Sequence, residues 1–348
     1  MLGDLTNFSD YLIVSSNSTL REYETSIYMF IILSLLYGCI SLISVFGNLL
    51  ILCVVIRNKK MHTVTNYFIC NLAMADLVIG LFATPFQFQT AYLQRWIFPN
   101  ILCKMAPFAA TLSSNVNIIT LVAISLDRHH VILHPLKKKL SKKKCILILI
   151  LIWIVSIMSI TRFFNYKVFH IENKKQCNPI NFELLKYDII ILTGLQFIIP
   201  FVIISITYIK IANHIYFAET PQTANCNQIK TRKKVIKMIL IVVVLFMICW
   251  APIHLFNVIN VLFPDTVGSY NNIHIIWFFS NSLAASNSCY NVFIYGLCSE
   301  RYKSEFKKML KCLPCIDDDK NREVIMEFRR LYYKNNGQIK QNQYSAFD

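Results

Sequence analysis

Seven long apolar stretches constrain the fold of this chain more than any other feature. A helix of ~20 residues crosses a hydrocarbon core about 30 Å thick, and most of the stretches reach that length. The sequence therefore predicts an all-α membrane protein, a seven-transmembrane helix bundle over residues 27–298. The predicted helices are Ile27–Ile56, Val64–Leu93, Ala106–Leu126, Cys145–Thr161, Ile189–Ile209, Met238–Phe263 and Ile273–Cys298.

Composition and charge placement agree with this prediction and orient the bundle. The chain is 55% hydrophobic and 16% charged, which is too apolar for a soluble protein with one core. Its net charge is +16, but 27 of its 35 Lys and Arg lie in alternate loops and after the seventh stretch. The positive-inside rule then predicts a multi-pass plasma membrane protein with an extracellular amino terminus and a cytoplasmic carboxyl terminus. No nucleic acid partner is predicted.

Both ends of the chain lie outside the predicted bundle. Residues 1–26 are polar and are predicted to form an extracellular tail without a signal peptide; this tail carries glycosylation sequons at Asn7 and Asn17. Residues 299–313 repeat apolar side chains at helical spacing among lysines, which predicts a short amphipathic eighth helix on the lipids of the inner leaflet. Residues 314–348 are predicted to be a disordered cytoplasmic tail.

Four of the twelve cysteines carry specific predictions. Cys103 opens the third helix and Cys177 lies in the following outer loop, so both face the oxidising side. They are predicted to form a disulfide. Cys312 and Cys315 follow the basic amphipathic segment on the inner side, where reversible palmitoylation is predicted.

Asp76 is the charged residue that lies deep within a predicted span. Burying a carboxylate in a membrane costs ~3 kcal/mol or more, so the side chain is predicted to face the bundle interior. Two interpretations remain open: a bound sodium ion, or a structural polar network without an ion. No other cofactor is predicted. The expected partners are Asn48, Asn117, Asn287, Ser288 and Asn291.

One short motif in each helix, in order, gives a specific resemblance. The motifs are Gly47-Asn48, Asn71-Leu72-Ala73 with Ala75-Asp76, Asp127-Arg128-His129, Trp153, Pro200 with Tyr208, Phe246 with Cys249-Trp250-Ala251-Pro252, and Asn291 with Tyr295. With them, residues 27–311 resemble the rhodopsin-like (class A) family of G-protein-coupled receptors. The resemblance implies a receptor and not an enzyme.

The resemblance also implies roles for the motif residues. Asp127 holds Arg128 in an ion pair at the inner end of the third helix, and release of the arginine opens a crevice for a heterotrimeric G protein. Proline kinks in the fifth and sixth helices let their inner halves swing. The predicted signalling residues are Asp127, Arg128, Tyr208, Phe246, Trp250, Pro252, Asn291 and Tyr295.

The chain departs from the family pattern at three places. Val292 stands where the family has proline in the seventh helix, His129 stands where it has tyrosine, and the outer part of the fourth helix has no proline. Two further positions exclude ligand classes. Ala285 replaces the retinal-linking lysine of opsins, and Ala110 replaces the aspartate that binds the ammonium group of amines.

Finer similarity favours a peptide ligand. Stretches such as Gln87-Phe88-Gln89 and Asn272–Trp277 resemble neuropeptide receptors, including leucokinin, RYamide, neuropeptide Y and tachykinin receptors. The outer face carries 8 basic and 8 acidic residues, so it has no net field to steer a strongly charged ligand. A small amidated peptide is predicted. The candidate contacts, each of which also suits a bond to a neighbouring helix, are Gln87, Gln89, Gln196, His254 and Asn257.

Other functions need features that the sequence lacks or leaves undecided. A transporter or channel would need internal repeats or several intramembrane ionisable residues. A lipid-sensing receptor of the same fold remains an alternative. The tail beyond Cys315 has one hydroxyl side chain of the Ser or Thr type, Ser345, so arrestin recruitment is predicted to be weak or to use Thr220, Thr223 and Thr231.

Overall fold

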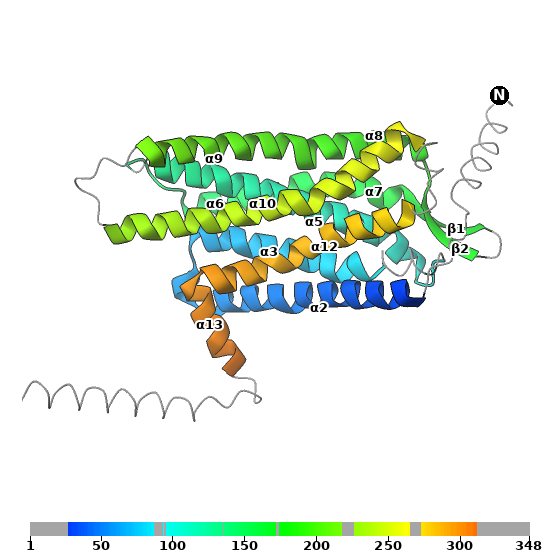
Figure 1. Ribbon diagram of the computed structural model, residues 1–348, viewed down its shortest axis with the longest axis horizontal. Coiled ribbons are helices and arrows are strands. Elements are labelled where there is room, and N and C mark those ends of the chain that lie inside the picture. Colours follow the sequence, from blue (N-terminus) through cyan, green and yellow to red (C-terminus); the bar gives the residue numbers. More distant parts are fainter. Residues whose placement is uncertain are drawn as a thin grey trace, which may run out of the picture. The chain divides into compact units, whose positions relative to one another are not determined.

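A computed structural model describes residues 27–86, 93, 95–134, 136–171, 174–217, 226–264 and 273–311. Long helices lie side by side in the part up to Cys298 (Figure 1). They are α2 (Ile27–Arg57), α3 (Val64–Phe82), α5 (Asn100–Leu133), α6 (Lys142–Ile157), α8 (Phe182–Thr193) with α9 (Ile199–Phe217), α10 (Cys226–Leu262) and α12 (Ile273–Cys298).

Short elements extend or join these helices. Helical turn η1 (Lys59–Met61) connects α2 to α3, while η2 (Met158–Ile160) and α7 (Thr161–Phe164) continue α6. Between α8 and α9 lies a π-helical segment, η3 (Gly194–Ile198). This segment ends just before Pro200, which lacks a backbone N–H and disrupts regular helical bonding there.

Six helical segments of the described part are long and apolar enough to cross a membrane. The seventh, α12, is 26 residues long, and ~1.5 Å per residue gives it the length to cross as well. Its hydropathy is lower because one face carries buried Ser and Asn side chains, among them Ser280, Ser288 and Asn291. It packs against α10, α2 and α3, and the predicted seven-helix bundle is confirmed.

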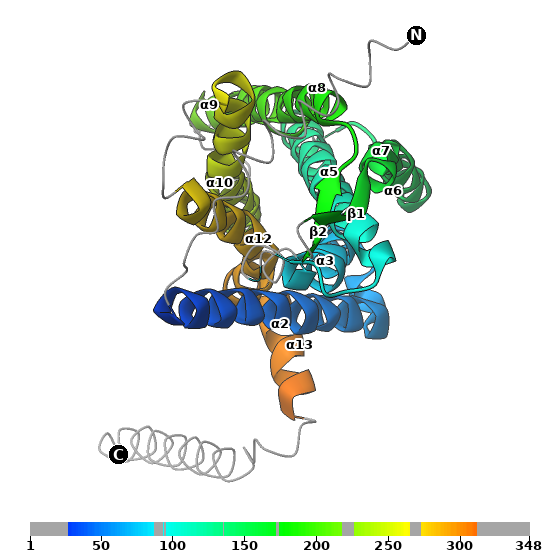
Figure 2. The same ribbon diagram turned by 90° about the vertical axis from the view of Figure 1, so that its right-hand side faces the viewer.

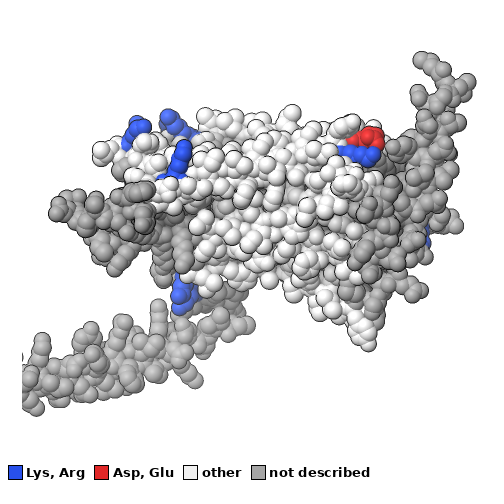
Figure 3. Space-filling view, turned by 45° about the horizontal axis from the view of Figure 1, so that its top comes forward, with Lys and Arg blue, Asp and Glu red and all other residues white. Residues whose placement is uncertain are grey.

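The surface of the bundle suits lipid. Many large apolar side chains of α2, α6 and α9 are exposed, including Leu35, Leu147, Ile150 and Ile206. Figure 3 shows charged side chains near the two ends of this face and an uncharged surface between them. Water would penalise so much exposed apolar area, whereas a bilayer requires it.

The helix bounds differ from the predicted ones in both directions. The second helix was predicted over Val64–Leu93 but ends at Phe82, so the end of that prediction was wrong; other helices are longer than predicted. The third helix was predicted over Ala106–Leu126 but extends over Asn100–Leu133, and the fourth begins at Lys142 instead of Cys145. Hydropathy marks the stretch that lies in hydrocarbon, while backbone hydrogen bonding continues into the polar flanks. Ser141 shows this directly, because its hydroxyl accepts from Lys144 N ahead of the apolar run.

A β-hairpin is the exception to the predicted all-α fold. Strands β1 (Tyr166–Ile171) and β2 (Lys174–Pro179) pair antiparallel, and Figure 2 shows them in front of the centre of the bundle. The predicted Cys103–Cys177 disulfide is present and ties β2 to the start of α5. Trp96 and Val168 are buried around it. The end of the bundle that carries this hairpin is called the hairpin end below.

Helix α13 (Glu300–Lys311) belongs to a second unit of the chain, which begins at Ser299. It lies within the segment predicted to be the amphipathic helix. Its Tyr302 and Phe306 rings contact each other with centroids 5.8 Å apart. The predicted tails, Asn7, Asn17, Cys312 and Cys315 lie outside the described residues.

Candidate functional site

Asp76 is at the centre of a polar network in the middle of the bundle. Its side chain is fully buried. Asn117 on α5 donates from Nδ2 to Oδ1 at 2.9 Å, and Asn291 on α12 donates to Oδ2 at 2.8 Å. The carboxylate therefore joins three helices, because each of its oxygens accepts a bond from a different one.

The other predicted partners of Asp76 do not reach its carboxylate. Asn48 donates instead to the backbone oxygens of Ser44 at 2.8 Å and Ser288 at 2.9 Å. The Ser288 hydroxyl donates to Ala285 O at 2.7 Å, and Asn287 is buried with no bond to the carboxylate among those of the described residues. The five residues Asn48, Asp76, Asn117, Ser288 and Asn291 form what we call the Asp76 layer.

The Asp76 layer has oxygen atoms that fit a hard cation. Within the described part, Asn48 Oδ1 and Asn117 Oδ1 are buried and accept no hydrogen bond. Together with a carboxylate they make a set of oxygen ligands, which suits a sodium ion better than a transition metal. The residues present therefore fit the ion that the sequence left as one of two interpretations.

Arg128 is held at the end of the bundle opposite the hairpin. It forms an ion pair with Asp127 at 3.0 Å and donates to the hydroxyl of Thr65 on α3. The sequence analysis did not predict a role for Thr65. Its hydroxyl in the first turn of the second helix is the sequence feature that could have suggested a partner for Arg128. Nearby polar atoms are buried and unpaired in the described part: Arg128 Nε, His129 Nε2 and Tyr208 Oη.

An aromatic column runs along α10. Phe246, Trp250 and His254 are four residues apart, so they share one helix face. The ring centroids of Phe246 and Trp250 are 5.7 Å apart and those of Trp250 and His254 are 6.0 Å apart. Pro252 lies inside the helix within this column. The column connects the hairpin half of the bundle with its middle.

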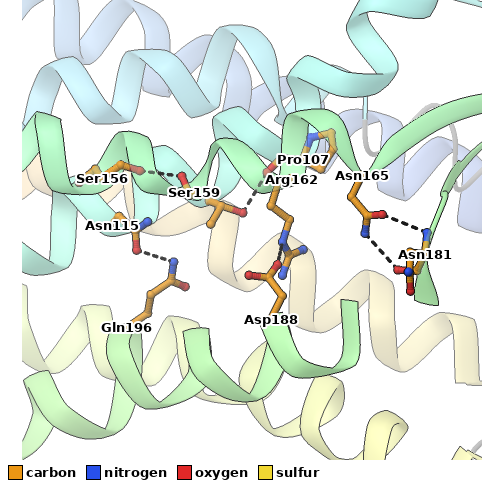
Figure 4. A network of polar contacts seen from close by, with 10 residues as sticks. Pro107, Asn115, Ser156, Ser159, Arg162, Asn165, Asn181, Asp188 and Gln196 are labelled. Atoms are coloured by element: carbon orange, nitrogen blue, oxygen red, sulfur yellow. Dashed lines mark hydrogen bonds and ion pairs between the residues drawn. The ribbon is translucent and has the colours of Figure 1, made fainter. Parts of the chain in front are cut away.

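Two predicted ligand contacts bond to neighbouring helices. Gln196 is buried and donates from Nε2 to Asn115 Oδ1 at 2.7 Å (Figure 4). His254 is also buried, and its Nδ1 lies 3.4 Å from the Thr193 hydroxyl. Asn257 is half-buried. Gln87 and Gln89 lie outside the described residues.

Three polar atoms near the Gln196–Asn115 and His254–Thr193 pairs have no hydrogen-bond partner in the described residues. Ser114 Oγ, Trp250 Nε1 and His254 Nε2 are buried and have no partner in the described part of the chain. Ser114 lies on α5 next to Asn115, the residue that Gln196 bonds. Trp250 and His254 lie on α10 with their rings in contact. Helices α5 and α10 both pack against η3, which carries Gln196. Ser114, Asn115, Gln196, Trp250 and His254 form what we call the Gln196 layer.

An ion pair that the sequence did not reveal joins α7 to α8. Arg162 Nε contacts Asp188 Oδ2, and both side chains are partly buried; Figure 4 shows them facing each other. Burial raises the pKa of the adjacent Tyr166 phenol, the Arg162 charge opposes this rise, and the Asp188 charge adds to it. Asn165 and Asn181 bond to each other close by, from Asn181 N to Asn165 Oδ1 at 3.0 Å.

Helix α12 contacts α2 at several points between Phe278 and Val292. Tyr37 donates to Phe278 O at 3.1 Å near the hairpin end, and Asn48 bonds the backbone of Ser288 further along. Gly47 faces Val292 so closely that a Cβ on the glycine would lie 2.6 Å from Val292 Cγ2. The helix is uninterrupted through Val292, where the family has proline.

The chain is similar to known proteins over most of its length. Residues 47–295 match the family described as 7 transmembrane receptor (rhodopsin family). The chain is 32% identical over 292 residues to a QRFP-like peptide receptor of Branchiostoma floridae, covering 79% of this chain and 76% of that protein.

Two further relatives show the same extent of similarity. Galanin receptor 2a of Danio rerio is 31% identical, over 81% of this chain and 78% of its own. The RYamide receptor of Tribolium castaneum is 29% identical, over 88% of this chain and 87% of its own. The similarity therefore spans the helices that carry both polar layers.

Proposed function

The chain belongs to the rhodopsin family of seven-transmembrane receptors, and we propose that it is a plasma membrane receptor for a small amidated neuropeptide. The observation that carries the proposal is its similarity, over about four fifths of its length, to proteins named as a QRFP-like peptide receptor and a tachykinin-like peptides receptor. The family consists of signalling receptors, not enzymes.

The Gln196 layer supports an uncharged, hydrogen-bonding group in the ligand. Its residues Gln196, His254 and Ser114 are buried and carry no fixed charge, and Ala110 offers no counter-ion for an amine. Trp250 Nε1 is a donor only, and Ser114 Oγ donates or accepts. A peptide amide supplies the carbonyl oxygen and N–H groups that such side chains bond.

The opposite end of the bundle supports coupling to a heterotrimeric G protein. Placing the hairpin and its disulfide outside the cell leaves Arg128 at the cytoplasmic end, together with most of the chain's Lys and Arg. Breaking the Arg128–Thr65 bond removes a link between α5 and α3 at this end, and breaking the Arg128–Asp127 ion pair frees the guanidinium. Ligand contact at Trp250 and His254 reaches that end through Phe246 and the kink at Pro252.

A cell-based screen tests the proposal. The receptor is expressed with a G-protein dissociation sensor and exposed to amidated neuropeptides, each paired with its free-acid form. We expect one amide to activate at nanomolar to micromolar concentration and its acid to be weaker. Dopamine, serotonin and octopamine are expected to give no response. Activation by a lipid or an amine, with every peptide silent at confirmed surface expression, contradicts the proposal.

A further inference from the structure

A cluster of six lysines stands where α5 is connected to α6. Six of the eight positions 137–144 are lysines, and all six are exposed: Lys137, Lys138, Lys139, Lys142, Lys143 and Lys144. The ion pairs of the described residues include none of them. We call this set the 137–144 lysine cluster. Its charge is not neutralised by any carboxylate of the described chain.

The charge of the cluster opposes the local helix dipole. Helix α6 begins at Lys142, and its first turn holds three lysines and no acidic residue. The amino end of a helix carries roughly half a positive charge and favours anions. The three lysines repel one another and the positive end of the helix dipole. Binding of an external anion therefore stabilises this turn more than it would stabilise a helix start without lysines.

The first turn of α6 is fixed to the bundle. Ser141 caps it, and the buried Cys145 directs its Sγ to Val64 O of α3 at 3.9 Å. The ammonium groups of Lys142–Lys144 are therefore presented from a rigid base and not from a loose loop.

Two of the lysines share a helix face with apolar side chains that point away from the protein. Ile146 and Ile150 follow Lys142 at intervals of four residues, and Leu147 and Ile154 follow Lys143 at intervals of four and seven. All four apolar side chains are exposed. In a membrane this face of α6 touches lipid tails, so the lysines above it lie at the headgroups of the same lipids.

We propose that the 137–144 lysine cluster binds the polyphosphorylated headgroup of an inner-leaflet lipid, a phosphatidylinositol bisphosphate, with its acyl chains along the exposed face of α6. The proposal rests on the orientation given under the proposed function. The lipid stabilises the start of α6 and fixes the connection between α5, which carries Arg128, and α6.

Retention of lipid by the purified full-length receptor in nanodiscs tests the site without any peptide. Three disc compositions are compared: phosphatidylcholine alone, phosphatidylcholine with phosphatidylserine, and phosphatidylcholine with phosphatidylinositol 4,5-bisphosphate at equal surface charge. Soluble inositol trisphosphate is the fourth arm. We expect the bisphosphate lipid to be retained at least tenfold more tightly than phosphatidylserine or the soluble headgroup, because several cations and the tail-contacting face act together.

Lys142→Gln, Lys143→Gln and Lys144→Gln together remove three charges and are expected to weaken retention by roughly fivefold for each lysine. The matched control removes three exposed charges at the hairpin end, Lys167→Gln, Lys174→Gln and Lys175→Gln, and is expected to retain the lipid fully. A Lys→Arg triple at 142–144 should retain it as well, which separates loss of charge from misfolding.

Three results overturn the proposal: unchanged retention in the 142–144 Gln variant, equal retention of phosphatidylserine, or equal binding of soluble inositol trisphosphate. In the first case, a loss of G-protein turnover in the same variant would assign the cluster to a protein partner instead. Peptide activation is measured in the phosphatidylcholine discs, so failure of the proposed receptor function appears there and not in lipid retention.

Discussion

The Asp76 layer and the Gln196 layer are both buried and polar, but they use their hydrogen bonds differently. In the Asp76 layer, both carboxylate oxygens accept amide bonds from two other helices, and the unpaired atoms are the acceptor oxygens of Asn48 and Asn117. In the Gln196 layer, the unpaired atoms include the Trp250 Nε1 donor and the Ser114 hydroxyl.

The difference assigns a separate task to each layer. A buried polar group without a partner costs about 1–3 kcal/mol, so the bonds of Asp76 to Asn117 and Asn291 stabilise the bundle. We propose that the unpaired oxygens of Asn48 and Asn117 serve a sodium ion. The Gln196 layer keeps donors, as a carbonyl-rich ligand needs. Mutations should therefore affect stability most in the first layer and ligand potency most in the second.

The largest effect is expected from Asp76→Leu. The change leaves the Asn117 and Asn291 amides without their acceptor and should lower the free energy of unfolding by about 2–6 kcal/mol, measured as thermal stability of the purified receptor. Adding Asn117→Leu and Asn291→Leu should recover part of the loss. If Asp76→Leu alone is as stable as the wild type, the Asp76 layer is not a structural network.

Asp76→Asn separates the sodium ion from the network. It keeps an acceptor for one amide while removing the charge that a cation needs, so it should abolish any dependence of agonist affinity on sodium. Radioligand competition in sodium and in a large organic cation measures this. A wild-type receptor without a sodium effect would contradict the bound ion and leave the structural network.

The next largest effect is expected from Arg128→Ala, on G-protein activation. It removes the guanidinium itself, which the proposed mechanism needs at the opened crevice after its resting bonds to Asp127 and Thr65 break; losing one charge-assisted bond there, worth about 1.5–3 kcal/mol, should reduce G-protein activation by about tenfold or more. Peptide binding should persist because the Gln196 layer is untouched. Thr65→Val removes only the hydroxyl that Arg128 bonds. Because this loosens the resting position of the arginine, basal activity should rise. Unchanged coupling in Arg128→Ala would remove the proposed role of the arginine.

Gly47→Ala should destabilise the receptor by about 1–3 kcal/mol through overpacking, because its Cβ would lie 2.6 Å from Val292 Cγ2. Val292→Ala in the same chain should relieve the loss. Thermal unfolding of the two single variants and the double variant measures the coupling. Additive effects would show that the two residues do not contact each other.

Val292→Pro tests the same contact by signalling. Proline removes a backbone donor inside α12 and weakens the helix near Tyr295, so basal activity at matched surface expression should rise. His129→Tyr, made in parallel, distinguishes the other departure from the family. Basal output at or below that of the wild type would show that α12 does not need a kink.

The smallest change in stability is expected from His254→Phe. It removes Nε2, which has no partner in the described chain, and the long 3.4 Å contact of Nδ1 with the Thr193 hydroxyl. An aromatic ring remains beside Trp250, so thermal stability should change by less than about 1 kcal/mol. Peptide potency should fall by about fivefold or more. A stability loss with unchanged potency would place His254 among the structural residues.

Some elements of the site were predictable because a single helix records them. Asp127 and Arg128 are adjacent in sequence, and Phe246, Trp250 and His254 repeat at the helical period, so their proximity follows from local geometry. The Cys103–Cys177 disulfide was predictable because both residues were assigned to the oxidising side. The resemblance to class A receptors is confirmed by the family match over residues 47–295.

Other contacts could not be predicted because they join residues far apart in sequence. Arg162 meets Asp188, Gln196 meets Asn115, and Arg128 meets Thr65 only because helices take particular rotations and depths against one another. The sequence correctly proposed Asn117 and Asn291 for Asp76 but also Asn48 and Ser288, which bond to backbone atoms instead.

The sequence by itself determined that the chain forms membrane-spanning helices, which residues line its polar interior, and that Val292 replaces a proline. These are properties of composition and local spacing, which the bilayer and the α-helical period select directly. The tertiary structure alone decided that Val292 fills the space at Gly47, and that the unpaired atoms are acceptors in the Asp76 layer but include a donor in the Gln196 layer. Those outcomes depend on the register between helices, which close packing fixes and which no single segment encodes.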